Sequence, residues 1–406
     1  MKSETTAASI NYERHKRCVD TESIVKRPKM SDPRLREVRE AVDRSISAEN
    51  DRIMADPKTW ESLVSEPEAA VKAAKRYNPT WDAMNAHLLN LTNCSLHSLP
   101  PEMSRLVDLQ VLYLRGNQLR ALPRWMANFD NLYTLDISGN PALGHPQQLL
   151  ESGKAGETKG VLASLRNLRE LYVDANYLAS QSTDFREHKL KSLVVFCDEM
   201  TEKLPDAIWG MVTLVNLQIH NSRVELPVEL GNLKMLVMLD FFSCHMRELP
   251  TAISEIPKLE TIRCFDCPEL CVIPPEIGEC AALDHLAFTR CWSVTSLPEE
   301  IGNCSALQTL YAEEASINEL PVQLSDCKKL RYVSVGQLSA IPLALGLLPN
   351  LSELRIAKGD EMILGQFRAT VNVIDEIKER ARVELGGRLT KRADPNRGAA
   401  TAGKSE

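Results

Sequence analysis

The strongest constraint on the fold of this chain is a Leu-Pro or Ile-Pro pair that recurs along its second half. The pairs begin at positions 204, 226, 249, 273, 297 and 320, so successive intervals are 22, 23, 24, 24 and 23 residues. Between pairs the chain repeats the apolar pattern Leu-x-x-Leu-x-Leu with small changes. A period in the twenties is typical of solenoids, in which one repeat cannot bury its apolar face alone and stacks on its neighbours.

A single repeat can be interpreted from the stretch 109–123. Leu112 and Leu114 alternate with polar neighbours, which is the period of a half-buried strand. Asn117 follows at a tight turn, where its short amide can bond to neighbouring backbone. Leu119 and Leu122 point inward again, and a proline then ends the turn before a short segment on the other side of the sheet.

This repeat resembles the leucine-rich repeat family, in the 23-residue class that carries Leu-Pro in its variable half. The motif Leu-x-x-Leu-x-Leu-x-x-Asn-x-Leu recurs over roughly residues 86 to 357, about two thirds of the chain. The resemblance implies an α/β horseshoe solenoid with a parallel β-sheet on its concave face. It also implies protein binding, because most members of the family bind proteins.

The pattern divides the chain into five expected segments. They are a disordered N-terminal segment (1–30), a helical cap region (31–80), about twelve repeats (81–360), a C-terminal capping helix (361–387) and a disordered basic tail (388–406). The cap region is alternatively a separate recognition module. An insertion of 13 residues near 144–160 contains glycines and lysines, but it lacks the order of a phosphate-binding loop.

The centres of the expected strands follow from the inward leucines. They are Leu89, Leu112, Leu135, Leu171, Leu193, Leu217, Leu239, Ile262, Leu286, Leu310, Val333 and Leu354. Val371, Ile374, Ile377, Ala381 and Leu385 then change to helical spacing, which predicts the capping helix.

Composition excludes several classes of function. The net charge is −7, so the chain has no global basic footprint for nucleic acid. No apolar stretch reaches the length of a membrane span, and the stretch 1–20 lacks the apolar run of a signal peptide. We therefore expect a cytoplasmic, monomeric protein that neither binds nucleic acid nor inserts into a membrane.

The eleven cysteines include the run Cys264-x-x-Cys267-x-x-x-Cys271, which has spacing of the kind found in zinc sites. The repeat explains them without a metal. Four cysteines occupy the Asn position of the turn: Cys94, Cys244, Cys267 and Cys291. Three others, Cys280, Cys304 and Cys327, align with Leu233, and Cys264 is an inward strand residue. Buried thiols behave as small apolar side chains, so we expect no metal and no cofactor, in a reducing compartment.

Catalysis finds little support in the sequence. It contains no nucleophile elbow, zinc-protease helix or phosphate loop. Cys264-Phe265-Asp266 matches the Cys-x-Asp of ubiquitin ligases that follow the repeats in some bacterial leucine-rich effectors. Cys264, however, takes an inward position, and only about fifty residues follow the last repeat. We predict that the protein is not an enzyme.

Side chains alternate across a strand, so residues between and after the inward positions project from the concave face in columns. The column after the second inward residue reads Arg115, Ser138, Asp174, Phe196, His220, Phe242, Phe265, Thr289 and Glu313. The column between the inward residues reads Tyr113, Asp136, Tyr172, Val194, Gln218, Asp240, Arg263, Ala287 and Tyr311. Four neighbouring repeats thus present a ring, in a chain with only 5% aromatic residues.

Exposed rings with a charged rim have the composition of an interface hot spot. The expected rim consists of Asp136, Asp174, Asp240, Arg263 and Glu313. The predicted partner-binding residues are Tyr172, Phe196, His220, Asp240, Phe242, Arg263, Phe265 and Tyr311. In the alternative interpretation the rings pack on each other, or under a terminal segment, and only stabilise the sheet.

These patterns predict a non-catalytic protein-binding scaffold or adaptor that recognises a partner protein on its concave face. The alternative is a type III-secreted bacterial effector that acts on a host protein in the host cytosol. It rests on a resemblance to leucine-rich effectors of plant and animal pathogens and on an N-terminus that contains Ser3, Thr5, Thr6 and Ser9 as an unstructured export signal. A ubiquitin-ligase-type enzyme is a third alternative.

Overall fold

The computed structural model describes residues 87–144, 160–181, 185, 188–199, 201–223, 225–357 and 370–384. The predicted N-terminal segment with its export signal, the helical cap region and the basic tail lie outside these described residues. So does nearly all of the insertion near 144–160.

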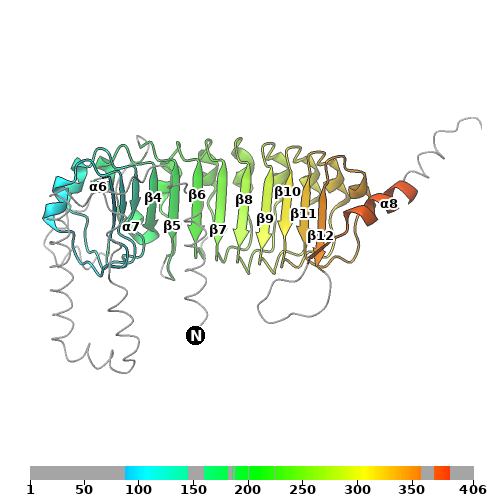
Figure 1. The fold of residues 1–406 in the computed structure, drawn as a ribbon, viewed down its shortest axis with the longest axis horizontal. Helices are drawn as coiled ribbons and strands as arrows, with labels where there is room; N and C mark the ends of the chain where they lie inside the picture. Colours follow the sequence, from blue (N-terminus) through cyan, green and yellow to red (C-terminus); the bar gives the residue numbers. More distant parts are fainter. Residues whose placement is uncertain are drawn as a thin grey trace, which may run out of the picture.

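The described residues form one open sheet of thirteen strands whose spatial order is their order in the chain. Figure 1 shows the strands side by side in a single row. The strands are β1 (Leu88–Asn90), β2 (Val111–Tyr113), β3 (Thr134–Asp136), β4 (Glu170–Asp174), β5 (Ser192–Phe196), β6 (Asn216–His220), β7 (Met238–Phe242), β8 (Thr261–Phe265), β9 (His285–Thr289), β10 (Thr309–Ala312), β11 (Tyr332–Val335), β12 (Glu353–Ala357) and β13 (Thr370–Asn372). All neighbours among β1 to β12 pair in parallel, and β13 pairs with β12 in the antiparallel direction. The predicted leucine-rich-repeat solenoid is confirmed.

The register of the sheet aligns the twelve inward residues that the sequence predicted as strand centres. Leu89 pairs with Leu112 and Leu112 with Leu135, and the alignment continues to Leu354. Leu135 pairs directly with Leu171 although 36 residues separate them. The extra residues of that repeat therefore do not shift the register of the sheet.

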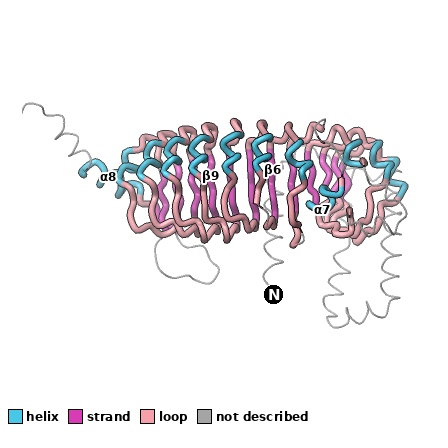
Figure 2. Tube along the Cα trace, turned by 180° about the vertical axis from the view of Figure 1, so that it is seen from behind, coloured by secondary structure: helices cyan, strands magenta, loops and turns pink. Residues whose placement is uncertain are grey.

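Short 3-10 helices cover one face of the sheet, and each follows a proline. They are η3 (Pro101–Arg105), η4 (Arg124–Asn128), η5 (Asp206–Gly210), η6 (Val228–Asn232), η7 (Thr251–Glu255), η8 (Pro275–Glu279), η9 (Glu299–Asn303), η10 (Val322–Asp326) and η11 (Leu343–Leu347). The capping prolines have φ between −59° and −78°, close to the value that the ring imposes. Figure 2 shows these helices in front of the strands, so the opposite face, which we call the open face, is the predicted concave face.

Between the open face and the helices lies one continuous apolar core. Inward strand leucines, the apolar residue inside each 3-10 helix and the residue that ends each helix are buried together. Leu233, Cys280, Cys304 and Cys327 all occupy this helix-ending position, as the repeat alignment predicted. Burial raises the pKa of the Cys280 and Cys327 thiols to about 11, so they are protonated and act as apolar side chains.

The C-terminal end of the sheet is closed by β13 and by two short helical elements, η11 and α8 (Ile374–Glu384). Ile374, Ile377 and Ala381 of α8 are buried at helical spacing. Helix α8 approaches η11 so closely that a Cβ on Gly346 would lie 2.6 Å from the carbonyl oxygen of Ile377. Val371, which helical spacing placed in the same helix, lies in β13 instead. No helix among the described residues is long and apolar enough to cross a membrane.

Candidate functional site

Four rings stack along the open face at the last residue of strands β5 to β8. We call Phe196, His220, Phe242 and Phe265 the aromatic ladder. Their ring centroids are 4.6, 4.7 and 6.2 Å apart in that order. The first two pairs are stacked, with interplanar angles of 26° and 11°. Parallel register places these residues side by side at the spacing of neighbouring strands, about 4.8 Å, which is close to the stacking distance of aromatic rings.

An arginine covers each end of the aromatic ladder. The guanidinium carbon of Arg115 lies 5.0 Å from the Phe196 ring centroid, and that of Arg290 lies 5.8 Å from the Phe265 centroid. Both distances are within the range of cation–π attraction. Arg290 also lies 5.6 Å from the ring of Trp292, whose side chain is 47% exposed. The ring faces at both ends of the ladder are therefore occupied.

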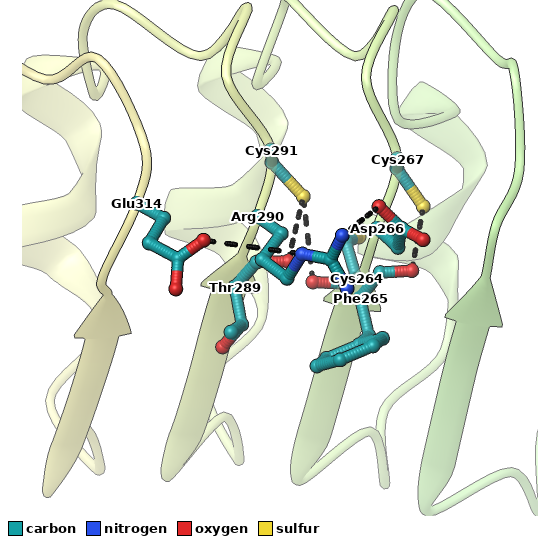
Figure 3. A network of polar contacts seen from close by, with 8 residues as sticks. All are labelled: Cys264, Phe265, Asp266, Cys267, Thr289, Arg290, Cys291 and Glu314. Carbon is teal, nitrogen blue, oxygen red and sulfur yellow. Dashed lines mark hydrogen bonds and ion pairs between the residues drawn. The ribbon is translucent and has the colours of Figure 1, made fainter. Parts of the chain in front are cut away.

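The arginine at the C-terminal end is held by two carboxylates from neighbouring repeats. Figure 3 shows Arg290 between Asp266 and Glu314, with the Phe265 ring beside it. The nitrogen–oxygen distances are 3.5 Å to Asp266 and 3.9 Å to Glu314. All three residues have a left-handed backbone, with φ of 57°, 59° and 59°, which L-residues rarely adopt. This conformation directs a column of charged side chains to the rim of the open face.

The arginine at the other end lies among buried acids. Asp136 accepts hydrogen bonds from the Ser138 hydroxyl at 2.6 Å and the Ser138 backbone N–H at 3.0 Å. Burial raises the pKa of Asp136 to about 6, against the lowering effects of Ser138 and Arg115. Burial also raises the pKa of Asp174, which accepts hydrogen bonds from the backbone N–H groups of Gly139 and Asn140.

An ion pair with a buried carboxylate lies at the centre of the open face beside the ladder. Arg263 donates two hydrogen bonds to Asp240, from Nε at 2.7 Å and from Nη2 at 2.6 Å. Asp240 is 0% exposed, whereas the Arg263 side chain is 40% exposed. Asp240 therefore contributes to a surface only by fixing the orientation of the Arg263 guanidinium.

A second group of rings lies toward the C-terminal repeats. Tyr311 is 5.6 Å from His285 and 4.7 Å from Tyr332, measured between ring centroids. Arg355 lies 5.8 Å from the Tyr332 ring. Burial, and then the charge of Arg263, lowers the pKa of His285, so this imidazole is neutral at pH 7.

The structure brings together some of the predicted partner-binding residues and separates others. Phe196, His220, Phe242 and Phe265 form one row, and Asp240 and Arg263 form one pair. Tyr172 lies in β4. Burial raises the pKa of its hydroxyl, and the nearby charge of Asp136 adds to this effect. Tyr311 belongs to the second group of rings. Of the expected rim, Asp136 and Asp240 are buried.

Sequence reasoning missed Arg290, Trp292 and Tyr332. Arg290 occupies the turn position that Gly116 fills in an earlier repeat, so a charged residue at a glycine position was the available signal. Trp292, which directly follows a predicted turn cysteine, is one of only five tryptophans. His285 and Tyr332 precede the first inward residue of their repeats, in a column that contains no run of four rings.

Among the described residues, the cysteines other than Cys271 are buried. Cys264 is 1% exposed, and burial raises its thiol pKa well above the ordinary value, so it is not a reactive nucleophile. Cys271 is exposed and donates to the Arg247 carbonyl oxygen. Among the described residues, no group of three or more His, Cys, Asp or Glu side chains is arranged to hold a metal ion.

A family model described as leucine rich repeat matches residues 85–141. These residues are leucine-rich repeats. The parallel register of the matched segment continues through β12, so the same repeat architecture extends beyond it. Domains of this kind present extended binding surfaces and in general bind proteins without catalysis. The 23-residue Leu-Pro class stays a prediction.

The chain is similar to several solved structures at low sequence identity. The leucine-rich repeat domain of the type III effector XopL is 20% identical, covering 73% of this chain and 95% of that chain, with a TM-score of 0.40. An internalin of Listeria monocytogenes is 14% identical, covering 68% and 87%, with a TM-score of 0.40. A leucine-rich-repeat protein of Leptospira interrogans is 17% identical, covering 77% and 96%, with a TM-score of 0.29. A comparison with curated proteins gave no match.

Proposed function

We propose that this leucine-rich-repeat protein is a non-catalytic scaffold or adaptor that binds a partner protein on the open face of its sheet. The observation that carries the proposal is the aromatic ladder, a row of four half-buried rings in a chain with few aromatic residues. Aromatic and arginine side chains dominate the energetics of protein interfaces, where truncation of one anchor can cost roughly 2 kcal/mol or more.

The proposed contact residues have different roles. The four rings of the ladder supply apolar anchors, and Tyr311 supplies a further ring nearer the C-terminus. Arg263 offers a guanidinium in an orientation that Asp240 holds. Tyr172 lies in β4, between the Asp136 and Val194 positions of the adjoining strands. The complete set is Tyr172, Phe196, His220, Asp240, Phe242, Arg263, Phe265 and Tyr311.

Rigid presentation supports this assignment. The ladder residues are anchored in strands that pair on both sides, and each ring is packed against the next. Side chains that are already ordered lose little conformational entropy when a partner binds. The same stacking also stabilises the sheet, which is the alternative interpretation of the rings, so a binding measurement has to separate the two roles.

The test compares the intact protein with the triple variant Phe196→Ala/Phe242→Ala/Phe265→Ala in affinity capture from a cell lysate. A matched control, Val228→Ala/Val322→Ala, removes two apolar side chains that are 72% and 61% exposed on the helical face. Circular dichroism first checks that all three proteins are folded. We expect a partner that the intact protein and the control retain and the triple variant loses.

Hydrogen exchange then locates the contact on the intact protein. The captured partner should slow exchange in β5 to β8 and leave η6 and η10 unchanged. Retention of the partner by the folded triple variant would show that the ladder only stabilises the sheet.

A further inference from the structure

Each end of the aromatic ladder carries one arginine and more than one carboxylate. We infer that the partner segment lying on the ladder is a basic peptide stretch, with apolar side chains over the rings and lysine or arginine beyond each end. This inference rests on the proposed function, because it specifies the partner of the same face.

At the N-terminal end, Arg115 interacts electrostatically with both Asp136 and Asp174. Asp198 is a third carboxylate here, since its charge also acts on Asp174. Asp198 is exposed and accepts hydrogen bonds from Asn176 at 2.6 Å and from the Thr201 hydroxyl at 2.7 Å. Two acids near the guanidinium, and a third near Asp174, leave this end of the ladder with a net negative charge at neutral pH.

At the C-terminal end, Arg290 forms its two long ion pairs with Asp266 and Glu314. Glu313 accepts a hydrogen bond from the Ser334 hydroxyl. It precedes Glu314 and is the last residue of the column that contains the ladder rings. The acidic side chains of the pairs remain 30% and 24% exposed. Three acids and one arginine make this end negative as well, and water reaches the charges.

The rings themselves select apolar groups. An aromatic ring is negative on its faces and positive at its edges. The faces of Phe196, His220 and Phe242 lie against each other, Phe265 is tilted by 46° from Phe242, and the two terminal rings have an arginine over them. A cation of the partner therefore finds partly exposed carboxylates at the two ends of the ladder, because Asp240 beside the ladder is fully buried and paired with Arg263. Apolar side chains of the partner fit the ring edges between the two charged ends.

The dimensions give the length of the segment. The ladder spans roughly 15 Å from the first ring to the last, and an extended chain advances about 3.3 Å per residue. About five residues of an extended peptide therefore cover the rings, and about ten reach both charged ends. The net charge of −7 also favours the approach of a basic partner.

Selection from a random library of displayed peptides, about twelve residues long, on the immobilised full-length protein tests this inference. The recovered peptides are synthesised, and their dissociation constants are measured by fluorescence anisotropy at low and high salt. Three variants accompany the intact protein. They are the triple ladder variant, the end-charge variant Asp266→Asn/Glu314→Gln, and the control Glu279→Gln/Glu300→Gln, which removes the same charge from the helical face.

We expect peptides that carry lysine or arginine on both sides of an apolar centre and that lose binding to the triple ladder variant. The end-charge variant should bind them about three- to tenfold more weakly, as expected for two screened charge pairs, and the control less than about twofold. High salt should weaken binding to the intact protein and reduce the difference between the two charge variants.

Other outcomes separate this inference from the proposed function. Peptides that need the ladder but are acidic or neutral, or that weaken equally in the control, would overturn the basic partner and leave the binding face in place. Peptides that bind the folded ladder variant equally well would overturn both. A selection that returns no binding peptide would overturn the inference, since it requires a short segment to suffice, while lysate capture would still test the proposed function.

Discussion

The same turn of the repeat is built in two ways in two regions of this molecule. After β2 and β3 it uses glycine followed by asparagine, at Gly116-Asn117 and Gly139-Asn140. After β7, β8 and β9 it uses another residue followed by cysteine, at Ser243-Cys244, Asp266-Cys267 and Arg290-Cys291. The backbone is left-handed at the first position in both kinds of turn. The repeats of β2 and β3 thus favour stability of the turn, whereas Asp266 and Arg290 place charged side chains where glycine would have none.

The hydrogen bonds of the two turns differ in number and strength. The Asn117 amide accepts from the backbone N–H groups of Cys94 and Leu96, both at 3.0 Å. It donates to the carbonyl oxygens of Leu91 at 2.8 Å and Leu114 at 2.7 Å. The Cys267 thiol is only a weak donor, with carbonyl oxygens at 3.6 and 3.9 Å. An asparagine therefore ties two repeats together, whereas a cysteine mainly fills space.

The largest effect is expected from Asn117→Ala. It leaves buried N–H and C=O groups of two repeats without their partner, so the free energy of unfolding should fall by about 3 kcal/mol or more. Cys267→Ala, the matched substitution in the other kind of turn, should cost about 1 kcal/mol because a small apolar group is lost. Chemical denaturation measures both. Equal losses would mean that the two turns contribute alike.

The acids at the two ends of the ladder differ in burial, and this gives a pH-dependent effect. Asp136 is buried, with its pKa raised from 3.8 to about 6, so the folded protein binds this proton more tightly than the unfolded chain does. Its contribution to stability is present below about pH 4 and is lost as the pH rises through about 6. Asp136→Asn should therefore raise the free energy of unfolding at pH 7 by on the order of 3 kcal/mol.

Unfolding curves of this variant and the parent at pH 4 and pH 7 check the sign. The two proteins should converge at pH 4. The control is Asp266→Asn, at the exposed end of the ladder, where a neutral substitution should change stability little at either pH. A parent more stable than Asp136→Asn at pH 7 would mean that the charged form of Asp136 is stabilised by Arg115 more than burial opposes it.

The sheet could be predicted well because the repeat pattern indicates directly which residues are buried. The apolar residue at each strand centre has to be buried, and all twelve centres align in the sheet. The ladder was predictable for the same reason, since parallel register converts a column of the alignment into a row in space. Short segments without repetition were less predictable, and Val371 joined β13 because an apolar residue fits a strand as well as a helix.

The arginines over the two ends of the ladder could not be predicted from the columns of the repeat alignment. Arg115 follows β2 and still reaches the Phe196 ring of β5 across the positions of Ser138 and Asp174, because its side chain is long. Asp240 looked like a rim residue because it projects from the open face, but it is fully buried and paired with the Arg263 guanidinium. Such burial arises between long side chains of neighbouring repeats, and a column gives each residue only its own direction.

The smallest effects come from the left-handed position itself, and they should have opposite signs at Gly116 and at Glu314, which is followed by Ala315 in its turn. Gly116→Ala forces an L-residue to φ of 69°, and its Cβ would lie 2.0 Å from the Asn93 side-chain oxygen. A loss of about 1–2 kcal/mol in the free energy of unfolding should follow. Glu314→Gly removes the penalty at φ of 59° and gives up one ion pair at 3.9 Å, with both partners partly exposed. It should gain up to about 1 kcal/mol, reduced by the entropy that glycine adds to the unfolded chain.

Thermal unfolding of Glu314→Gly beside Glu314→Gln separates backbone strain from charge. Both variants lose the carboxylate, but only the glycine relaxes the backbone, so the glycine variant should be the more stable of the two. Equal stability would indicate that the left-handed backbone carries no strain here. A gain with glycine that is accompanied by weaker binding of basic peptides would show that the later repeats retain charged residues at this position at some cost to stability, because the surface uses them.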